Sequence, residues 1–158
     1  MIVPFREEFL GPSSLDLTLG NRLLVEVRHT REMQELDISN TSPQKPYWMA
    51  PSEFLLAHTE QFFNIPEFIA ARFALKSSRA REGIEHLLAG FADPGFHDSV
   101  LTLELLNVRR FHPVAIWYKM RIGQATFEYL HSEPQVSYAV KGHYNNDKSV
   151  SASKGYFE

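Results

Sequence analysis

The chain has 158 residues, of which 44% are hydrophobic and 13% aromatic, enough for one domain around a single core. Its formal net charge of -3, with both signs mixed along the sequence, argues against a protein that binds long nucleic acid, which would carry a basic face. The absence of cysteine excludes disulfides, thiolate zinc sites and a catalytic cysteine, and it fits a reducing, cytoplasmic location. No apolar run approaches the ~20 residues that span a bilayer, so we expect no membrane association.

Alternating apolar and polar residues predict a series of short β-strands separated by turns. The predicted strands cover residues 13–20, 22–27, 54–59, 69–75, 100–106, 114–118 and 123–130. Residues 29–46 are polar and predict a loop with a short strand at 35–38, and Ile65-Pro66-Glu67 predicts a short turn or helical piece. We expect one domain over 1–158, with an N-terminal arm at 1–12 and a polar, mobile C-terminal tail at 135–158.

Short strands with few long helical periodicities are typical of an all-β fold. The expected architecture is a distorted β-barrel or jelly-roll-like domain with short helical pieces. No internal repeat or low-complexity segment interrupts this pattern.

Glu104 is a carboxylate inside the apolar run VLTLELL at 100–106. A carboxylate is rarely buried unless it is paired or has a chemical task. Strand alternation places Leu103 and Leu105 on one face and Glu104, with Thr102, on the other. That second face is mixed in polarity, so it either lines a pocket or faces water.

The cluster KSSRAR at 76–81 combines cations with hydroxyl groups that suit phosphate oxygens, since charge-assisted hydrogen bonds to anions are short and strong. The same composition is common in solvated basic turns, and both readings stay open. Asp93-Pro94-Gly95-Phe96 predicts a β-turn, in which Asp93 serves either as a turn residue or as a ligand contact. There is no Walker loop or dinucleotide fingerprint, and the histidines lack the spacing of metal ligands.

Taken together, these segments resemble the dCTP deaminase branch of the dUTPase-like superfamily. The matching motifs run in family order and cover about residues 13 to 150. They are SSLDLTLG at 13–20, PSEFLL at 51–56, KSSRAR at 76–81, AGFADPGF at 89–96, Leu103-Glu104 with Asn107, and RIGQ at 121–124. The resemblance implies a dUTPase-like homotrimer with active sites between subunits. It also implies a deoxycytidine or deoxyuridine nucleotide whose triphosphate carries Mg²⁺, and hydrolytic deamination without zinc.

The resemblance implies catalytic roles for Glu104, Arg81 and Ser77. Glu104 would take a proton from water and return it to the leaving amine, a role for which an apolar strand can raise the pKa of a glutamate toward the working pH. Arg81 with Ser77 would orient or polarise the water. Asp93 would accept the sugar 3'-hydroxyl, and Phe96 would pack on the deoxyribose and exclude a 2'-hydroxyl.

Further substrate contacts are implied at the phosphates and at the base. Ser78 would meet phosphate, while backbone groups near Ala89 and from Thr102 to Glu104 would read the base edge. The implied substrate-binding set is completed by Lys76, Leu103, Gln124, Tyr138, Tyr144 and Lys148.

The sequence departs from the family pattern at the phosphate end. Lys76 stands where arginine is usual, which loses bidentate geometry. His143 and Asp147 replace a common lysine and glutamine, and an aspartate there would repel phosphate unless Mg²⁺ or Lys148 intervenes. Ala89-Gly90-Phe91 resembles the bifunctional enzymes that release dUMP, so the product is dUTP or dUMP.

Three alternatives stay open at this stage. A dUTPase would explain Asp93, although plain dUTPases usually lack a carboxylate at the position of Glu104. A nucleotide-binding regulator without catalysis would explain the altered phosphate end. A β-domain with no nucleotide site is the simplest reading of the composition.

Overall fold

β-strands make up most of the structure, a computed structural model that describes residues 1–155. The strands are β1 Ile2–Val3, β2 Leu15–Thr18, β3 Arg22–Glu26, β4 Met33–Asp37, β5 Tyr47–Met49, β6 Phe54–Phe63, β7 Ile69–Leu75, β8 Ile84–His86, β9 Phe91–Ala92, β10 Ser99–Asn107, β11 Val114–Ile116 and β12 Arg121–Tyr129. The helical pieces are η1 Glu7–Phe9, α1 Ser77–Glu82 and α2 Tyr138–Lys141. The prediction of an all-β domain with short helical pieces is confirmed.

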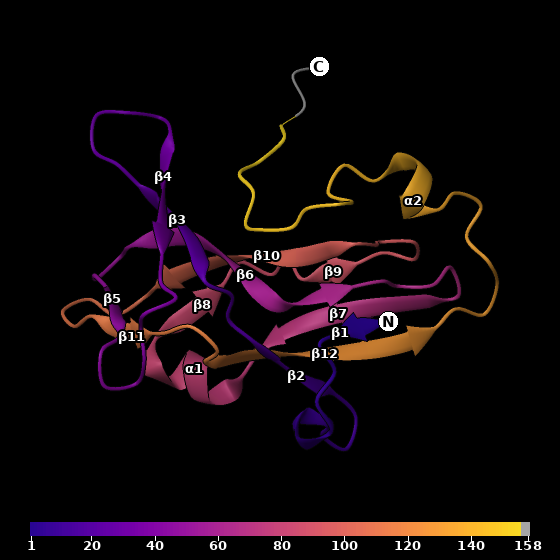
Figure 1. Ribbon diagram of the computed structural model, residues 1–158, viewed down its shortest axis with the longest axis horizontal. Coiled ribbons are helices and arrows are strands. Elements are labelled where there is room, and N and C mark those ends of the chain that lie inside the picture. The colour runs from indigo at the N-terminus through magenta and orange to yellow at the C-terminus, as the bar shows by residue number, and fades with distance from the viewer. Residues whose placement is uncertain (156–158) are drawn as a thin grey trace.

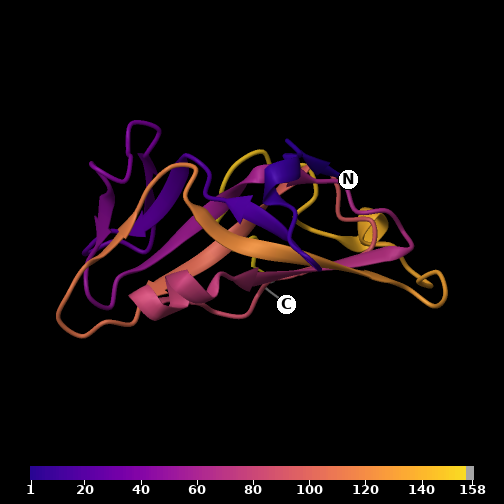
Figure 2. The ribbon, with the colours of Figure 1, turned by 90° about the horizontal axis from the view of Figure 1, so that it is seen from below.

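Two antiparallel sheets carry the fold. The first has the order β4-β3-β6-β10-β8, with β1 also paired to β6, and the second has the order β2-β12-β7-β9. A separate pair, β5 with β11, lies at one end of the elongated domain (Figure 1). Turned by 90° (Figure 2), β12 runs along the length of the domain, and α1 and α2 lie toward opposite ends.

The core forms where the apolar faces of the two sheets meet. Leu103 and Leu105 of β10 are fully buried, as are Leu17 of β2 and Ile122 of β12. The intervening residues of β10, from Thr102 to Leu106, are only partly buried. The alternation predicted for the strand of Glu104 is therefore confirmed, and it directs Glu104 away from the core face.

Strand positions were predicted better than strand lengths. The strands over 69–75 and 22–27 are found as β7 and β3, whereas β6 continues four residues beyond the predicted 59 to Phe63. The loop assigned to 29–46 was partly wrong, because β4 begins at Met33 and pairs with β3 along its whole length. Arg22 forms ion pairs with Asp37 and Glu35 across this hairpin. Because these cross-strand pairs are polar, β4 lacks the alternation of apolar and polar residues from which strands were predicted.

The basic cluster after β7 is a short helix. Residue Gly83 ends α1 in the left-handed region (φ 104), and its N–H bonds back to the carbonyls of Ala80 and Arg79. Ser77, Ser78 and Arg81 are exposed on this helix. A solvated turn was one of the two readings left open for this cluster, and its helical form was not predicted.

The turn predicted at Asp93-Pro94-Gly95-Phe96 is confirmed. The Asp93 carbonyl accepts a hydrogen bond from the Phe96 N–H at 3.0 Å. Gly95 has φ 88, which a side chain rarely adopts and which a type II turn requires at its third position. The turn places Asp93 and Phe96 on either side of a tight bend between β9 and β10.

The C-terminal segment lies along β10. The Val100 N–H donates to the Asp147 carbonyl at 2.9 Å, and the Tyr138 N–H donates to the Pro94 carbonyl at 3.0 Å. The mobility expected of residues 135–158 stays a prediction, and residues 156–158 lie outside the described part. Within residues 1–155, no helix has the length and apolar character needed to cross a membrane.

Candidate active site

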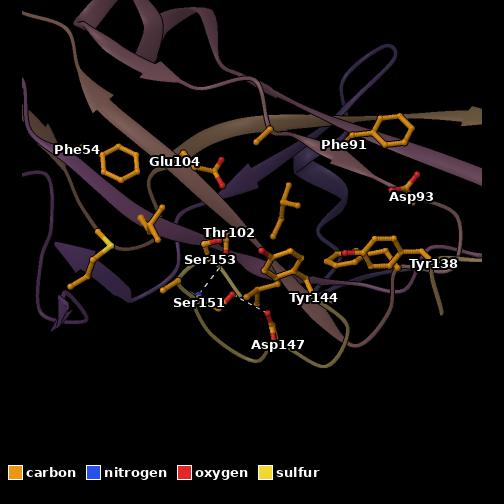
Figure 3. A pocket seen from close by; sticks show the side chains of 17 residues that line it. Phe54, Phe91, Asp93, Thr102, Glu104, Tyr138, Tyr144, Asp147, Ser151 and Ser153 are labelled. Atoms are coloured by element: carbon orange, nitrogen blue, oxygen red, sulfur yellow. Dashed lines mark hydrogen bonds between the residues drawn. The ribbon is translucent and has the colours of Figure 1, made fainter. Parts of the chain in front are cut away.

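A cavity of about 610 Å³ opens beside β10, within the size range of small-molecule sites. Figure 3 shows Glu104 near its centre, with Phe54 on one side and Phe91 and Asp93 on the other. The cavity is lined by residues of the first sheet, the 89–96 hairpin and the C-terminal segment. They are Met33, Phe54, Leu56, Ala89, Phe91, Asp93, Phe96, Val100, Leu101, Thr102, Glu104, Tyr138, Tyr144, Asp147, Ser151, Ala152 and Ser153.

Glu104 reaches the cavity from the middle of β10, where it pairs with Leu56 of β6. Its side chain is 26% exposed. The Oε2 atom is buried and has no hydrogen-bond partner within residues 1–155. The nearest ionisable side chain is His86, whose Nε2 lies 3.4 Å from this oxygen.

The 89–96 hairpin contributes a second carboxylate and an aromatic wall. Burial raises the pKa of the Asp93 carboxyl above its ordinary value of 3.8. The Phe96 ring is buried and meets the Tyr138 ring edge-on at 5.7 Å. Burial also raises the pKa of Tyr138, and the nearby Asp93 charge adds to the shift.

The C-terminal segment closes one side of the cavity; its Tyr138 and Tyr144 were in the predicted set, whereas Ser151, Ala152 and Ser153 were not. Ser151 donates from its N–H to Thr102 Oγ1 at 3.4 Å and from Oγ to Asp147 at 2.9 Å (Figure 3). Lys154 Nζ pairs with Asp147 at 2.6 Å. The cation next to Asp147 is therefore Lys154, while Lys148 donates to the Asp98 carbonyl at 2.8 Å.

The predicted phosphate cluster lies outside this cavity. Ser77, Ser78 and Arg81 are exposed on α1, and their side chains make no hydrogen bond or ion pair within residues 1–155. Lys76 Nζ is 2.5 Å from Asp16 Oδ1, and Arg121 lies 3.5 Å from the other oxygen of that carboxylate. Within one chain, Ser77 and Arg81, predicted to act with Glu104 on the water, and Ser78, predicted to meet phosphate, are thus separated from Glu104.

Two further predicted residues are also placed elsewhere. Leu103 is fully buried on the core face, so only its backbone is near the cavity. Gln124 of β12 accepts a hydrogen bond from Ser14 Oγ at 3.2 Å, away from the lining residues. Of the predicted set, the cavity collects Glu104, Ala89, Asp93, Phe96, Thr102, Tyr138 and Tyr144.

The charged side chains that line the cavity are all acidic. Its lining includes the carboxylates of Asp93, Glu104 and Asp147 and no lysine or arginine. Within residues 1–155, no group of three or more His, Asp or Glu side chains is arranged to hold a metal ion. A polyphosphate bound here would need cations from outside this wall, or a metal carried by its own oxygens.

The apolar end of the cavity was not foreseen. Met33, Phe54 and Leu56 come from β4 and β6, and nothing in the sequence signals that these strands approach Glu104. His86 was also missed, because β8 has only three residues and shows no usable periodicity.

The fold and the cavity define a β-domain with a carboxylate-bearing, aromatic-walled pocket of nucleotide size. The model of the dCTP deaminase-like family matches residues 1–130. The chain belongs to this family, which confirms the resemblance found in its motifs.

Relatives from two bacteria carry the name "dCTP deaminase, dUMP-forming". The protein of Bifidobacterium animalis subsp. lactis is 35% identical, with 97% of this chain and 84% of the relative covered. The protein of Dictyoglomus thermophilum is 36% identical, with 92% and 80% covered. Both therefore match this chain over most of their own length.

Solved structures share the fold. The 2'-deoxycytidine 5'-triphosphate deaminase of Agrobacterium tumefaciens has a TM-score of 0.65 at 20% identity, covering 82% of this chain. This chain spans only 42% of that protein. The EIAV dUTPase has a TM-score of 0.54 at 15% identity, covering 85% and 88%. The dUTPase-like fold is therefore confirmed.

Proposed function

We propose that this protein deaminates dCTP by hydrolysis and continues to dUMP. The observation that carries the proposal is Glu104, a 26% exposed carboxylate that lines an aromatic-walled cavity and whose buried Oε2 forms no hydrogen bond within residues 1–155. The names of the two bacterial relatives support the same reaction and its dUMP product.

The deamination step needs one general acid and base. Glu104 would take a proton from water as the oxygen adds to C4 of the cytosine ring, and it would return that proton to the departing amine. The balance is dCTP plus water giving dUTP plus ammonia. In the second step water cleaves dUTP to dUMP and pyrophosphate.

The hairpin would hold the sugar during both steps. Asp93 would accept the 3'-hydroxyl, and the buried Phe96 ring would leave no room for a 2'-hydroxyl. The backbone from Thr102 to Glu104, together with Ala89, would read the base edge. Their common position in one cavity supports these roles.

The complete site would be built from two copies of the chain. The cavity has no lysine or arginine, whereas Ser77, Ser78 and Arg81 project from α1 without partners within residues 1–155. Leu88, adjoining the cavity at Ala89, is 92% exposed, and Phe91 is 47% exposed, apolar surface that a neighbouring copy would cover. A homotrimer that brings α1 of one copy to the cavity of the next would supply the missing cations.

Magnesium would enter with the substrate. Mg²⁺ keeps several waters and binds phosphate oxygens with one or two carboxylates, and Asp147 is the carboxylate at the C-terminal side of the cavity. When bound, the ion would neutralise triphosphate charge. Lys154 holds the Asp147 side chain at that place.

A product assay tests the proposal. Purified protein is incubated with dCTP and Mg²⁺, and the nucleotides are separated by chromatography. We expect dUMP, and we expect Glu104→Gln to bind dCTP without turning it over. Accumulation of dUTP alone would mean deamination without cleavage. Cleavage of dUTP that survives Glu104→Ala, with dCTP untouched, would instead identify a dUTPase.

A further inference from the structure

His86 is the nearest ionisable neighbour of the catalytic carboxylate. Its Nε2 lies 3.4 Å from Glu104 Oε2, and its side chain is 5% exposed. Neither atom has a hydrogen-bond partner within residues 1–155. A buried polar atom without a partner costs about 1–3 kcal/mol, so two such atoms facing each other are the natural partners for one bond.

The protein fixes His86 at this place from two sides. The Leu87 N–H, next along the chain, donates to the Glu104 carbonyl at 3.3 Å, which ties β8 to the backbone of the catalytic residue. The Phe73 ring of β7 packs against the imidazole with centroids 4.7 Å apart. A closing shift of about 0.5 Å would bring Nε2 and Oε2 to the length of a charge-assisted hydrogen bond.

We propose that His86 is a positioning residue that donates its Nε2–H to Glu104 Oε2 and leaves Oε1 to exchange the proton with water and amine. His86 keeps its own proton throughout, and Oε1 gains one proton and returns it. His86 does not line the cavity, so it acts on the substrate only through Glu104. The inference rests on the proposed function, because it assigns a partner to that carboxylate.

The charged groups around His86 leave Glu104 as its acceptor. Within residues 1–155, Glu104 is the one charged side chain within ion-pair distance of His86. On the side of β7, His86 meets the aromatic ring of Phe73. Helix α1 packs on β8, and its charged residues Arg79 and Glu82 pair with each other. The cavity adds only the carboxylates of Asp93 and Asp147.

Three substitutions separate the donor from the packing. Glutamine places an amide N–H at the position of Nε2, asparagine places it at that of Nδ1, and phenylalanine keeps a ring on Phe73 without a donor. We expect His86→Gln to retain kcat within about fivefold and His86→Asn and His86→Phe to lose about 10- to 100-fold, the loss of a hydrogen bond to a charged group. KM for dCTP should stay within about threefold, and the acid limb of the kcat profile should move to higher pH in His86→Phe.

The comparison of the three variants has two outcomes that would overturn the inference. They are equal losses of kcat in the glutamine and phenylalanine variants, and a loss confined to KM. If His86→Phe does not fold, the comparison of kcat between His86→Asn and His86→Gln serves as the test. Wild-type protein that turns over no dCTP would reject the proposed function and this inference with it.

Discussion

Replacing Asp93 by asparagine removes one negative charge while keeping the turn. Asparagine suits the first position of a β-turn as well as aspartate, and the turn bond from Phe96 uses the Asp93 backbone carbonyl. A hydrogen bond to a charged acceptor contributes about 1.5–3 kcal/mol against about 0.5–1.5 kcal/mol for a neutral one. The difference of about 1.4 kcal/mol predicts a tenfold loss in kcat/KM for dCTP.

The assay compares dCTP with 2',3'-dideoxy-CTP in the wild type and in Asp93→Asn. If Asp93 accepts the 3'-hydroxyl, the preference for dCTP shrinks about tenfold in the variant, since the hydroxyl has lost its charged partner. A preference that is unchanged while both substrates slow equally would refute the assignment. It would leave Asp93 as a turn residue only.

The same pair of substrates gives a pH test. Because burial raises the pKa of Asp93, its carboxyl takes up a proton at a higher pH than an exposed aspartate would. The preference for the 3'-hydroxyl should therefore be full at neutral pH and decline as the pH falls through that raised value. In Asp93→Asn it should not vary with pH.

Three further substitutions test the fold and the sugar pocket. Burial lowers the pKa of His58 below 6.5, so the unfolded chain binds more protons there than the folded chain. The free energy of unfolding therefore falls as the pH drops below about 6.5. His58→Gln should reduce this dependence of the free energy of unfolding on pH, measured in urea melts at pH 8 and pH 5.5. Leu103→Ala, at a fully buried site, should lower the free energy of unfolding by about 2.7–5 kcal/mol in the same melts. Phe96→Leu should lower the ratio of kcat/KM for dCTP over CTP, because the smaller side chain leaves space beside the 2'-carbon.

Matched variants control each of these measurements. His29→Gln, at an exposed histidine, should leave the pH slope unchanged, and an equal slope change in both variants would contradict the role of His58. Leu87→Ala, at a half-exposed leucine, should cost much less than Leu103→Ala. An unaltered dCTP-to-CTP ratio in Phe96→Leu would remove Phe96 from sugar selection.

The sequence predicted where Glu104 and Asp93 lie because the signals that place them are local. Alternation along β10 set the face of Glu104, and the Asp-Pro-Gly-Phe turn set the direction of the hairpin carrying Asp93. Both signals lie within a few residues of the atoms they place. The closing of the cavity by Ser151 and the approach of His86 depend on contacts between distant segments, and no local pattern encodes them.

The phosphate half shows the opposite case. The KSSRAR motif was recognised, and an active site between subunits was implied by the family resemblance alone, since sequence order does not say which copy of a chain meets which. The partner of Lys76 is Asp16, sixty positions earlier, and the partner of Asp147 is Lys154, whereas the sequence had suggested Lys148 or Mg²⁺ near that carboxylate. Long, flexible cations choose among several carboxylates, and only the folded arrangement decides the pairing.

Mixed assemblies test the central claim that one active site uses two copies of the chain. Glu104→Gln and Arg81→Ala are each expected to abolish turnover, and they are co-expressed with different tags and purified as mixed trimers. If Glu104 and Arg81 of one site come from different copies, every mixed trimer has one site of its three with both wild-type residues, and about one third of the wild-type dCTP turnover returns. If both residues of a site come from the same chain, every copy is defective and the mixture stays inactive.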